Sequence, residues 1–173
     1  MNTRLLSITA GTLIGLSLIF FIISNALPIW NKFGTEYQAF TYGLWRSCVT
    51  VSNMKQCVAI TCPSENDEIG FCSKILVARA FVTISCVLSG ISAICLLVYT
   101  IIGDSAPRVL LLVAKGLVLA CLIMGIIGVA VGINAKIDTG SEVKLQLGAA
   151  AIIGIVAIII NFFGIIATLS IRQ

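Results

Sequence analysis

The segment 145–171, LQLGAAAIIGIVAIIINFFGIIATLSI, decides the fold class of this chain. It contains no charged residue, and it is longer than the roughly 20 apolar residues that cross the hydrocarbon core of a membrane as a helix. Three further segments have the same character and contain at most one charged residue each: 5–27, 75–102 and 109–133. The sequence therefore predicts an all-α membrane protein with four transmembrane helices.

The composition supports the same class. Hydrophobic residues make up 59% of the 173 residues and charged residues only 10%, with a mean hydropathy of +1.12. A water-soluble domain carries about 25% charged residues, so this chain has too little polar surface to cover a soluble core. The formal net charge is +4, but the basic residues form no cluster with interleaved aromatic residues, so no nucleic-acid partner is expected.

The placement of charge predicts the orientation. The chain ends and the connection 103–108 carry a net positive charge, whereas 28–74 and 134–144 are balanced. Because positive flanks remain cytoplasmic, we expect both termini in the cytosol and the two balanced segments outside the cell, in one domain of residues 1–173. This topology requires that the first span is retained, although Ser24-Asn25-Ala26 loosely fits a signal-peptide cleavage site; the apolar region of a signal peptide is typically shorter, about 7–15 residues.

Cysteines are concentrated in the first outer segment. Four of the seven lie in 28–74: Cys48, Cys57, Cys62 and Cys72. An even number of cysteines on the oxidising side predicts two disulfides, with free or metal-bound thiols as the alternative. The chain contains no histidine and no paired CxxC spacing, so we expect no metal site.

The same segment shows a β-hairpin pattern. Residues 39–51 and 55–61 are rich in aromatic and β-branched side chains, and Ser52-Asn53-Met54 suits the turn between them. A disulfide between Cys48 and Cys57 would staple this hairpin. A bond between Cys62 and Cys72 would then close the acidic stretch that follows, although four cysteines permit other pairings.

Within the spans, small residues recur four positions apart. These pairs are Gly11 and Gly15, Gly128 and Gly132, and Ala150 and Gly154. They predict close helix packing inside one bundle, with a specific dimer interface as the alternative. We expect Lys115 to extend to the cytoplasmic membrane surface, Asn161 to bond another helix, and the three cysteines in the spans to be packed rather than palmitoylated.

Trp30, Gly43-Leu44-Trp45, Cys48 and Cys57 follow one another between the first two spans. This W–GLW–C–C order resembles the signature of the claudin superfamily. That superfamily includes claudins, the peripheral myelin protein and epithelial membrane protein group, and gamma-type auxiliary subunits of ion channels. Ala78-Arg79-Ala80 and residues 85–90 are also similar to the second span of claudins. The resemblance at the level of motifs covers residues 30–90.

The resemblance implies a left-handed four-helix bundle capped by a small antiparallel sheet from the first extracellular loop. It also implies that a disulfide joins Cys48 and Cys57 across two strands. The residues that would anchor the sheet to the helix ends are Trp30, Gly43, Leu44 and Trp45, near Arg79. The residue types agree with this, because Trp favours the membrane interface and Arg79 can reach the headgroups or bond loop carbonyls.

The function that the resemblance implies is a claudin-like protein of tight junctions or cell adhesion in the plasma membrane. Such a protein would polymerise with copies of itself in the same and the opposite membrane and form or regulate a paracellular barrier. The apolar Val58, Ala59 and Ile60 are candidate contact residues. The alternative is an auxiliary subunit that binds a channel or receptor within the lipid bilayer.

An enzyme is not expected. The four cysteines of 28–74 lack the CxxC spacing of a thiol–disulfide relay, and the usual acid–base chemistry of histidine is absent. We therefore expect no catalytic residue and no cofactor.

Overall fold

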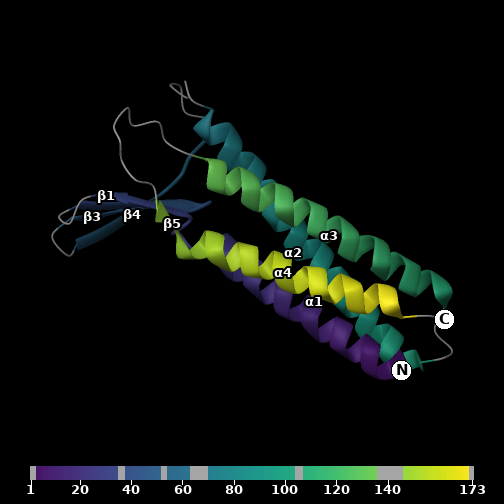
Figure 1. Cartoon of the computed structure of the whole chain (residues 1–173). Helices are drawn as coiled ribbons and strands as arrows, with labels where there is room; N and C mark the ends of the chain where they lie inside the picture. Colours follow the sequence, from purple (N-terminus) through teal and green to yellow (C-terminus); the bar gives the residue numbers. More distant parts are fainter. Residues whose placement is uncertain are drawn as a thin grey trace.

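The computed structural model describes residues 3–34, 38–51, 54–62, 70–103, 107–135 and 146–171. Four long helices run side by side, and a small sheet projects from one end of them (Figure 1). The helices are α1 (Thr3–Ala26), α2 (Phe71–Ile102), α3 (Arg108–Asn134) and α4 (Ala149–Ser170). Helix α1 begins, and α4 ends, at the end of the bundle that is farthest from the sheet (Figure 1).

All four helices are long and apolar enough to cross a membrane, which indicates a multi-pass membrane protein. Helix α2 has 32 residues, a length of about 48 Å at 1.5 Å per residue, so it exceeds a hydrocarbon core of about 30 Å. It begins at Phe71 rather than at residue 75, which places Cys72 in its first turn. Helix α4 begins at Ala149, four residues later than the apolar run suggests.

Five short strands form one antiparallel sheet. They are β1 (Asn31–Gly34), β2 (Gln38–Tyr42), β3 (Arg46–Val51), β4 (Met54–Ala59) and β5 (Gln146–Leu147). Their order across the sheet is β4-β3-β2-β1-β5. The predicted combination of four apolar helices with a small antiparallel sheet is confirmed, and the strand β5, which precedes α4, was not foreseen.

The hairpin prediction was wrong about its first strand. Residues 39–51 form two strands, β2 and β3, because the chain turns at Gly43, whose N–H donates to the carbonyl oxygen of Arg46 (2.9 Å). A Cβ atom at Gly43 would lie 2.4 Å from Cα of Pro28, so only glycine fits this approach. Met54 belongs to β4, opposite Val51. The rest of the expected turn, 52–53, and the acidic stretch 63–69 lie outside the described residues.

Small residues pack the helices against each other, as the sequence predicts for a single bundle. A Cβ atom at Gly128 of α3 would lie 2.9 Å from a methyl group of Val82 on α2. A Cβ atom at Gly154 of α4 would lie 2.9 Å from the hydroxyl of Ser24 on α1. Most of the paired small residues therefore pack within the bundle. Gly15 is an exception, because a Cβ atom there would meet nothing within 4 Å.

Polar side chains also join the helices. Ser17 and Ser24 lie two turns apart on α1, and their hydroxyls donate to the carbonyl oxygens of Ala157 (3.0 Å) and Ala150 (2.8 Å) on α4. Such bonds hold helices together where lipid supplies no hydrophobic drive. The amide nitrogen of Asn161 on α4 donates to the sulfur of Cys121 on α3 (3.5 Å), so this side chain does bond another helix.

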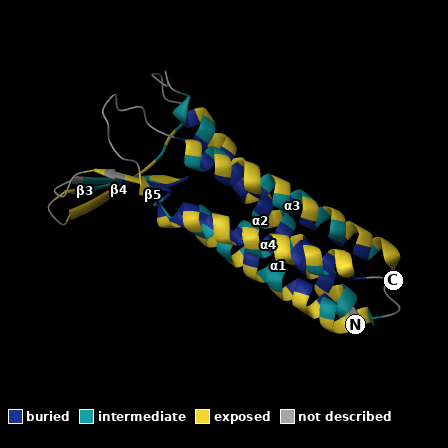
Figure 2. Ribbon diagram, viewed as in Figure 1, coloured by how far each residue is buried: buried dark blue, intermediate teal, exposed yellow. Residues whose placement is uncertain are grey.

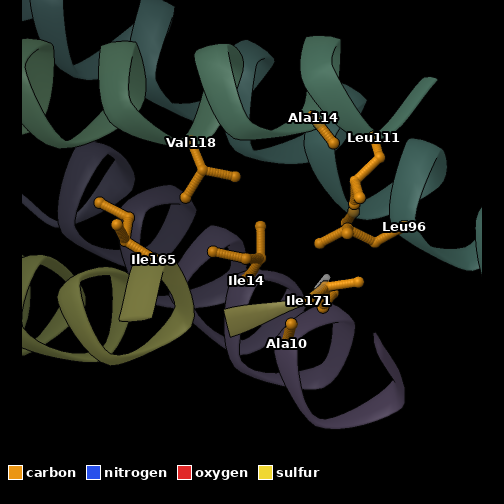
Figure 3. Packing of buried hydrophobic residues seen from close by; sticks show 9 residues of the cluster. Ala10, Ile14, Leu96, Leu111, Ala114, Val118, Ile165 and Ile171 are labelled. Atoms are coloured by element: carbon orange, nitrogen blue, oxygen red, sulfur yellow. The ribbon is translucent and has the colours of Figure 1, made fainter. Parts of the chain in front are cut away.

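Buried residues face the centre of the bundle and exposed apolar residues cover its outside (Figure 2). In the half remote from the sheet, one cluster draws side chains from all four helices and from the residue after α4 (Figure 3). Its members include Ala10, Ile14, Leu96, Leu111, Val118, Ile165 and Ile171. This arrangement leaves the opposite half of the bundle to support the sheet.

Candidate functional site: a sheet anchored to the helix ends

Trp30 lies at the point where the sheet meets the helices and is only 2% exposed. Its indole N–H donates to the carbonyl oxygen of Ser24 (2.9 Å). Its ring packs on α3 at Gly132, where a Cβ atom would lie 2.6 Å from the ring. Its backbone N–H donates to the carbonyl oxygen of Tyr42 in β2 (2.6 Å). Trp30 therefore fixes the start of the sheet to two helices at once.

A hydrophobic cluster surrounds this indole ring. It contains Trp30, Leu44, Ala78, Val82, Val129, Ala150 and Ala151. Leu44 comes from the turn between β2 and β3, and the alanines leave room for the ring against α2 and α4. We call this cluster the sheet seat.

Arg79 and Trp45 make a second connection between α2 and the sheet. The Arg79 guanidinium donates to the carbonyl oxygens of Leu44 and Ile60 and lies 4.9 Å from the centre of the Trp45 ring. A cation over an indole face is attractive. Arg79 therefore bonds loop carbonyls on both sides of the β3–β4 hairpin.

The indole N–H of Trp45 is held in turn by α1. It donates to the side-chain oxygen of Asn25 (2.9 Å), whose amide nitrogen donates to the hydroxyl of Thr83 on α2 (3.3 Å). Unlike Trp30, Trp45 remains 47% exposed. The two tryptophans thus differ: Trp30 is buried at the centre of the sheet seat, whereas Trp45 bonds α1 and contacts Arg79 at the surface.

Tyr42, at the end of β2, packs edge-on against Phe71, the first residue of α2, with the ring centres 5.9 Å apart. Partial burial raises the pKa of the Tyr42 phenol above its ordinary value. A phenol is already neutral at physiological pH, and burial moves its ionisation further above that range, so Tyr42 adds no charge here.

Both disulfides are formed: Cys48–Cys57 and Cys62–Cys72. Cys48 and Cys57 lie directly opposite each other in β3 and β4 with their Cα atoms 4.0 Å apart. The bond from Ile60 N–H to Trp45 C=O makes that pair a hydrogen-bonded one. By alternation, the pair of Cys48 and Cys57 is non-hydrogen-bonded, where opposite residues approach most closely.

The second disulfide joins the end of the sheet to helix α2. Cys62–Cys72 ties the chain after β4 to the first turn of α2. In the described ranges, no group of three or more histidine, cysteine or acidic side chains could hold a metal ion.

Strand β4 forms one edge of the sheet, and all six of its residues are exposed. Met54 is 74% exposed and Val58 is 64% exposed. The alternation that follows from the Ile60–Trp45 bond turns the backbone N–H and C=O groups of Lys55, Cys57 and Ala59 away from β3, toward the open edge.

The three candidate contact residues are therefore not equivalent. Val58 and Ala59 lie on the exposed strand, whereas Ile60 is only partly exposed. Both backbone groups of Ile60 are already used, by Trp45 and by Arg79. Of the three, only Val58 and Ala59 therefore lie on the exposed edge strand, and Ile60 takes part in the contacts that hold the sheet.

The sequence did not reveal that the segment before α4 belongs to the site. The Gly148 N–H donates to the carbonyl oxygen of Trp30 (2.8 Å), and the Ala150 N–H donates to that of Ile29 (3.0 Å). These bonds bring β5 beside β1. The only signal was Gly148 near the start of the apolar run 145–171.

Removing the Cys48–Cys57 bond by replacing both cysteines with alanine should lower the free energy of unfolding by about 2–3 kcal/mol, since a cross-link across so short a loop restricts the unfolded chain by that amount. Denaturant titration of the purified protein in detergent measures the change. The Cys62→Ala/Cys72→Ala variant is a matched comparison, because the two disulfides span 9 and 10 residues. A loss below about 0.5 kcal/mol for Cys48/Cys57 would contradict the assignment of a stabilising staple.

No protein-family model matches the chain, and no curated protein matches its sequence. The features of the chain that bear on its function are the sheet, the anchor of the sheet and the apolar helices. These comprise an edge strand with open backbone groups, two disulfides and a bundle with an apolar exterior.

Proposed function

We propose that the chain is a claudin-like junction or adhesion protein of the plasma membrane. In this proposal the helices form a left-handed transmembrane bundle with both termini in the cytosol. The sheet lies outside the cell and associates with copies of the same chain in the same and in the opposite membrane. The resulting polymer forms or regulates a paracellular barrier.

The observation that carries the proposal is the exposed edge strand β4. An edge strand with unpaired N–H and C=O groups is a template for pairing with another chain. Here the groups without a partner among the described residues belong to Lys55, Cys57 and Ala59, and exposed apolar side chains at Met54 and Val58 flank them. The disulfide and the Arg79 clamp hold this edge rigid, which reduces the entropy lost on association.

The proposal is tested by expressing the chain in cells that lack junctions and imaging its enrichment at cell–cell contacts, with freeze-fracture to detect strands. The wild type should concentrate at contacts. Ala59→Pro should reduce this enrichment severalfold, because it removes an outward N–H while leaving the bonds between β3 and β4 intact.

Ala59→Ser is the matched control, because it retains the backbone N–H and should behave like the wild type. Thiol alkylation, which labels only free cysteines, shows whether the Cys48–Cys57 bond has formed and so checks that each variant is folded. Absence of contact enrichment in the folded wild type would refute the junction proposal. Co-purification of a channel or receptor would then support the alternative function of an auxiliary subunit.

A further inference from the structure

A pocket of about 500 Å³ opens on the side of the bundle where α1 and α2 meet the turn between β2 and β3. Its apolar floor is formed by Ile22 and Ala26 on α1, by Pro28 just beyond it and by Cys86 on α2. The volume lies within the range of about 300–1,000 Å³ that is typical of small-molecule sites. A hydrocarbon chain is the natural ligand for such a floor.

The polar residues that line the pocket are Asn25, Trp45 and Arg46. Asn25 and Trp45 are already bonded to each other, and Asn25 is bonded to Thr83 as well. Arg46 is different, because its side chain is exposed and makes no hydrogen bond or ion pair within the described residues. The pocket thus combines an apolar floor with one guanidinium that has donors to spare.

We propose that this pocket binds a phospholipid whose acyl chain lies on the floor and whose phosphodiester accepts hydrogen bonds from Arg46. A guanidinium matches phosphate oxygens with two parallel N–H donors. The pocket lies at the last turn of α1, where an apolar helix ends beside a tryptophan, and tryptophans favour the boundary between hydrocarbon and headgroups. The polar and apolar parts of a phospholipid therefore meet their counterparts in the pocket at one depth.

The pocket adjoins the anchor of the sheet. Arg46 is the first residue of β3, and Trp45 is the residue clamped by Arg79. A lipid bound at Trp45 and Arg46 would connect the membrane surface to β3, the strand that pairs with β4. The inference depends on insertion of the helices in a membrane and is independent of the proposed junction function.

The experiment titrates the chain of 173 residues in detergent micelles with a phosphatidylglycerol whose acyl chains are brominated near the headgroup. Bromine quenches tryptophan fluorescence on contact, and Trp45 is exposed at the pocket whereas Trp30 is buried. Quenching should saturate. Arg46→Gln should raise the half-saturating lipid fraction about tenfold through the loss of charge-assisted bonds, whereas Arg108→Gln, at the opposite end of the bundle, should not change it.

Two further comparisons test the apolar floor and the headgroup. Ala26→Phe fills the floor and should abolish saturable quenching, while Ile19→Phe, exposed on α1 outside the pocket, should leave it unchanged. A brominated monoacylglycerol, which lacks phosphate, should bind the wild type and Arg46→Gln equally weakly. Unsaturable quenching, or equal phospholipid binding by the wild type and Arg46→Gln, would overturn the proposal.

Discussion

Trp30→Ala should lower the free energy of unfolding by about 3–5 kcal/mol, the usual cost of removing a large aromatic side chain from a packed core. Trp30 is 2% exposed, its indole N–H bonds Ser24 and its ring covers Gly132. The neighbouring helices cannot close the space, because they are held together by bonds such as Ser24 to Ala150. Unfolding by denaturant in detergent measures the loss, and hydrogen exchange should show faster exchange at the β1 amides.

Trp45→Ala is the comparison that gives this result its meaning. Trp45 contributes one hydrogen bond to Asn25 and one contact with the Arg79 guanidinium while remaining 47% exposed. Its loss should cost about 1–2 kcal/mol. Trp30→Phe, which retains a ring but no N–H donor, should fall between the two. Equal losses for Trp30→Ala and Trp45→Ala would contradict the assignment of Trp30 as the buried seat.

The helices were predictable because hydrophobic length alone determines them. Runs such as 5–27 and 75–102 have no soluble arrangement, and the helices found there begin and end within four residues of the predicted limits. The sequence favoured the pairs Cys48–Cys57 and Cys62–Cys72 but left other pairings of the four cysteines open. Selection among the alternatives depends on strand register, which places Cys48 opposite Cys57.

The order of the strands in the sheet could not be predicted from the sequence, because tertiary contacts determine it. Strand β5 has two residues, too few for any periodic pattern, and it is held through the bond from Gly148 to Trp30. The split between β2 and β3 depends on the close approach of Gly43 to Pro28, which lies in another part of the chain. Neither neighbour can be identified from local propensity.

Two cations illustrate the same limit. Each was recognised as a charge in an apolar run, with extension to the membrane surface as one interpretation. For Arg79 the other interpretation, bonding to loop carbonyls, matches the structure, where its guanidinium donates to the carbonyl oxygens of Leu44 and Ile60. The Lys115 ammonium donates to the carbonyl oxygen of Ile171 (3.0 Å) at the end of α4. A cation at a helix C-terminus is favourable because carbonyls there lack helical partners. The residue type indicated a polar partner, but only the fold supplies it.

Gly148→Ala should be among the most destabilising single-methyl changes in the chain. A Cβ atom there would lie 2.1 Å from the carbonyl oxygen of Ile29 and 2.7 Å from the carbonyl carbon of Trp30. Both neighbours are backbone, so no side chain can rotate away and the segment 146–150 must move. The move breaks the bonds from Gly148 to Trp30 and from Ala150 to Ile29. We expect a loss of about 3 kcal/mol, the upper end of the range for overpacking, with faster hydrogen exchange at β1 and β5.

Glycines elsewhere provide controls with the opposite expected sign. A Cβ atom at Gly15 on α1 or at Gly116 on α3 would meet nothing within 4 Å. Because alanine is favoured over glycine in a helix by about 1 kcal/mol, Gly15→Ala and Gly116→Ala should leave stability unchanged or raise it. If Gly148→Ala shifted stability as little as these two variants, β5 would not be docked against Ile29 and Trp30. Strand β5 would then contribute nothing to the anchor, and α4 would support the sheet only through the packing of Ala150 and Ala151 around Trp30.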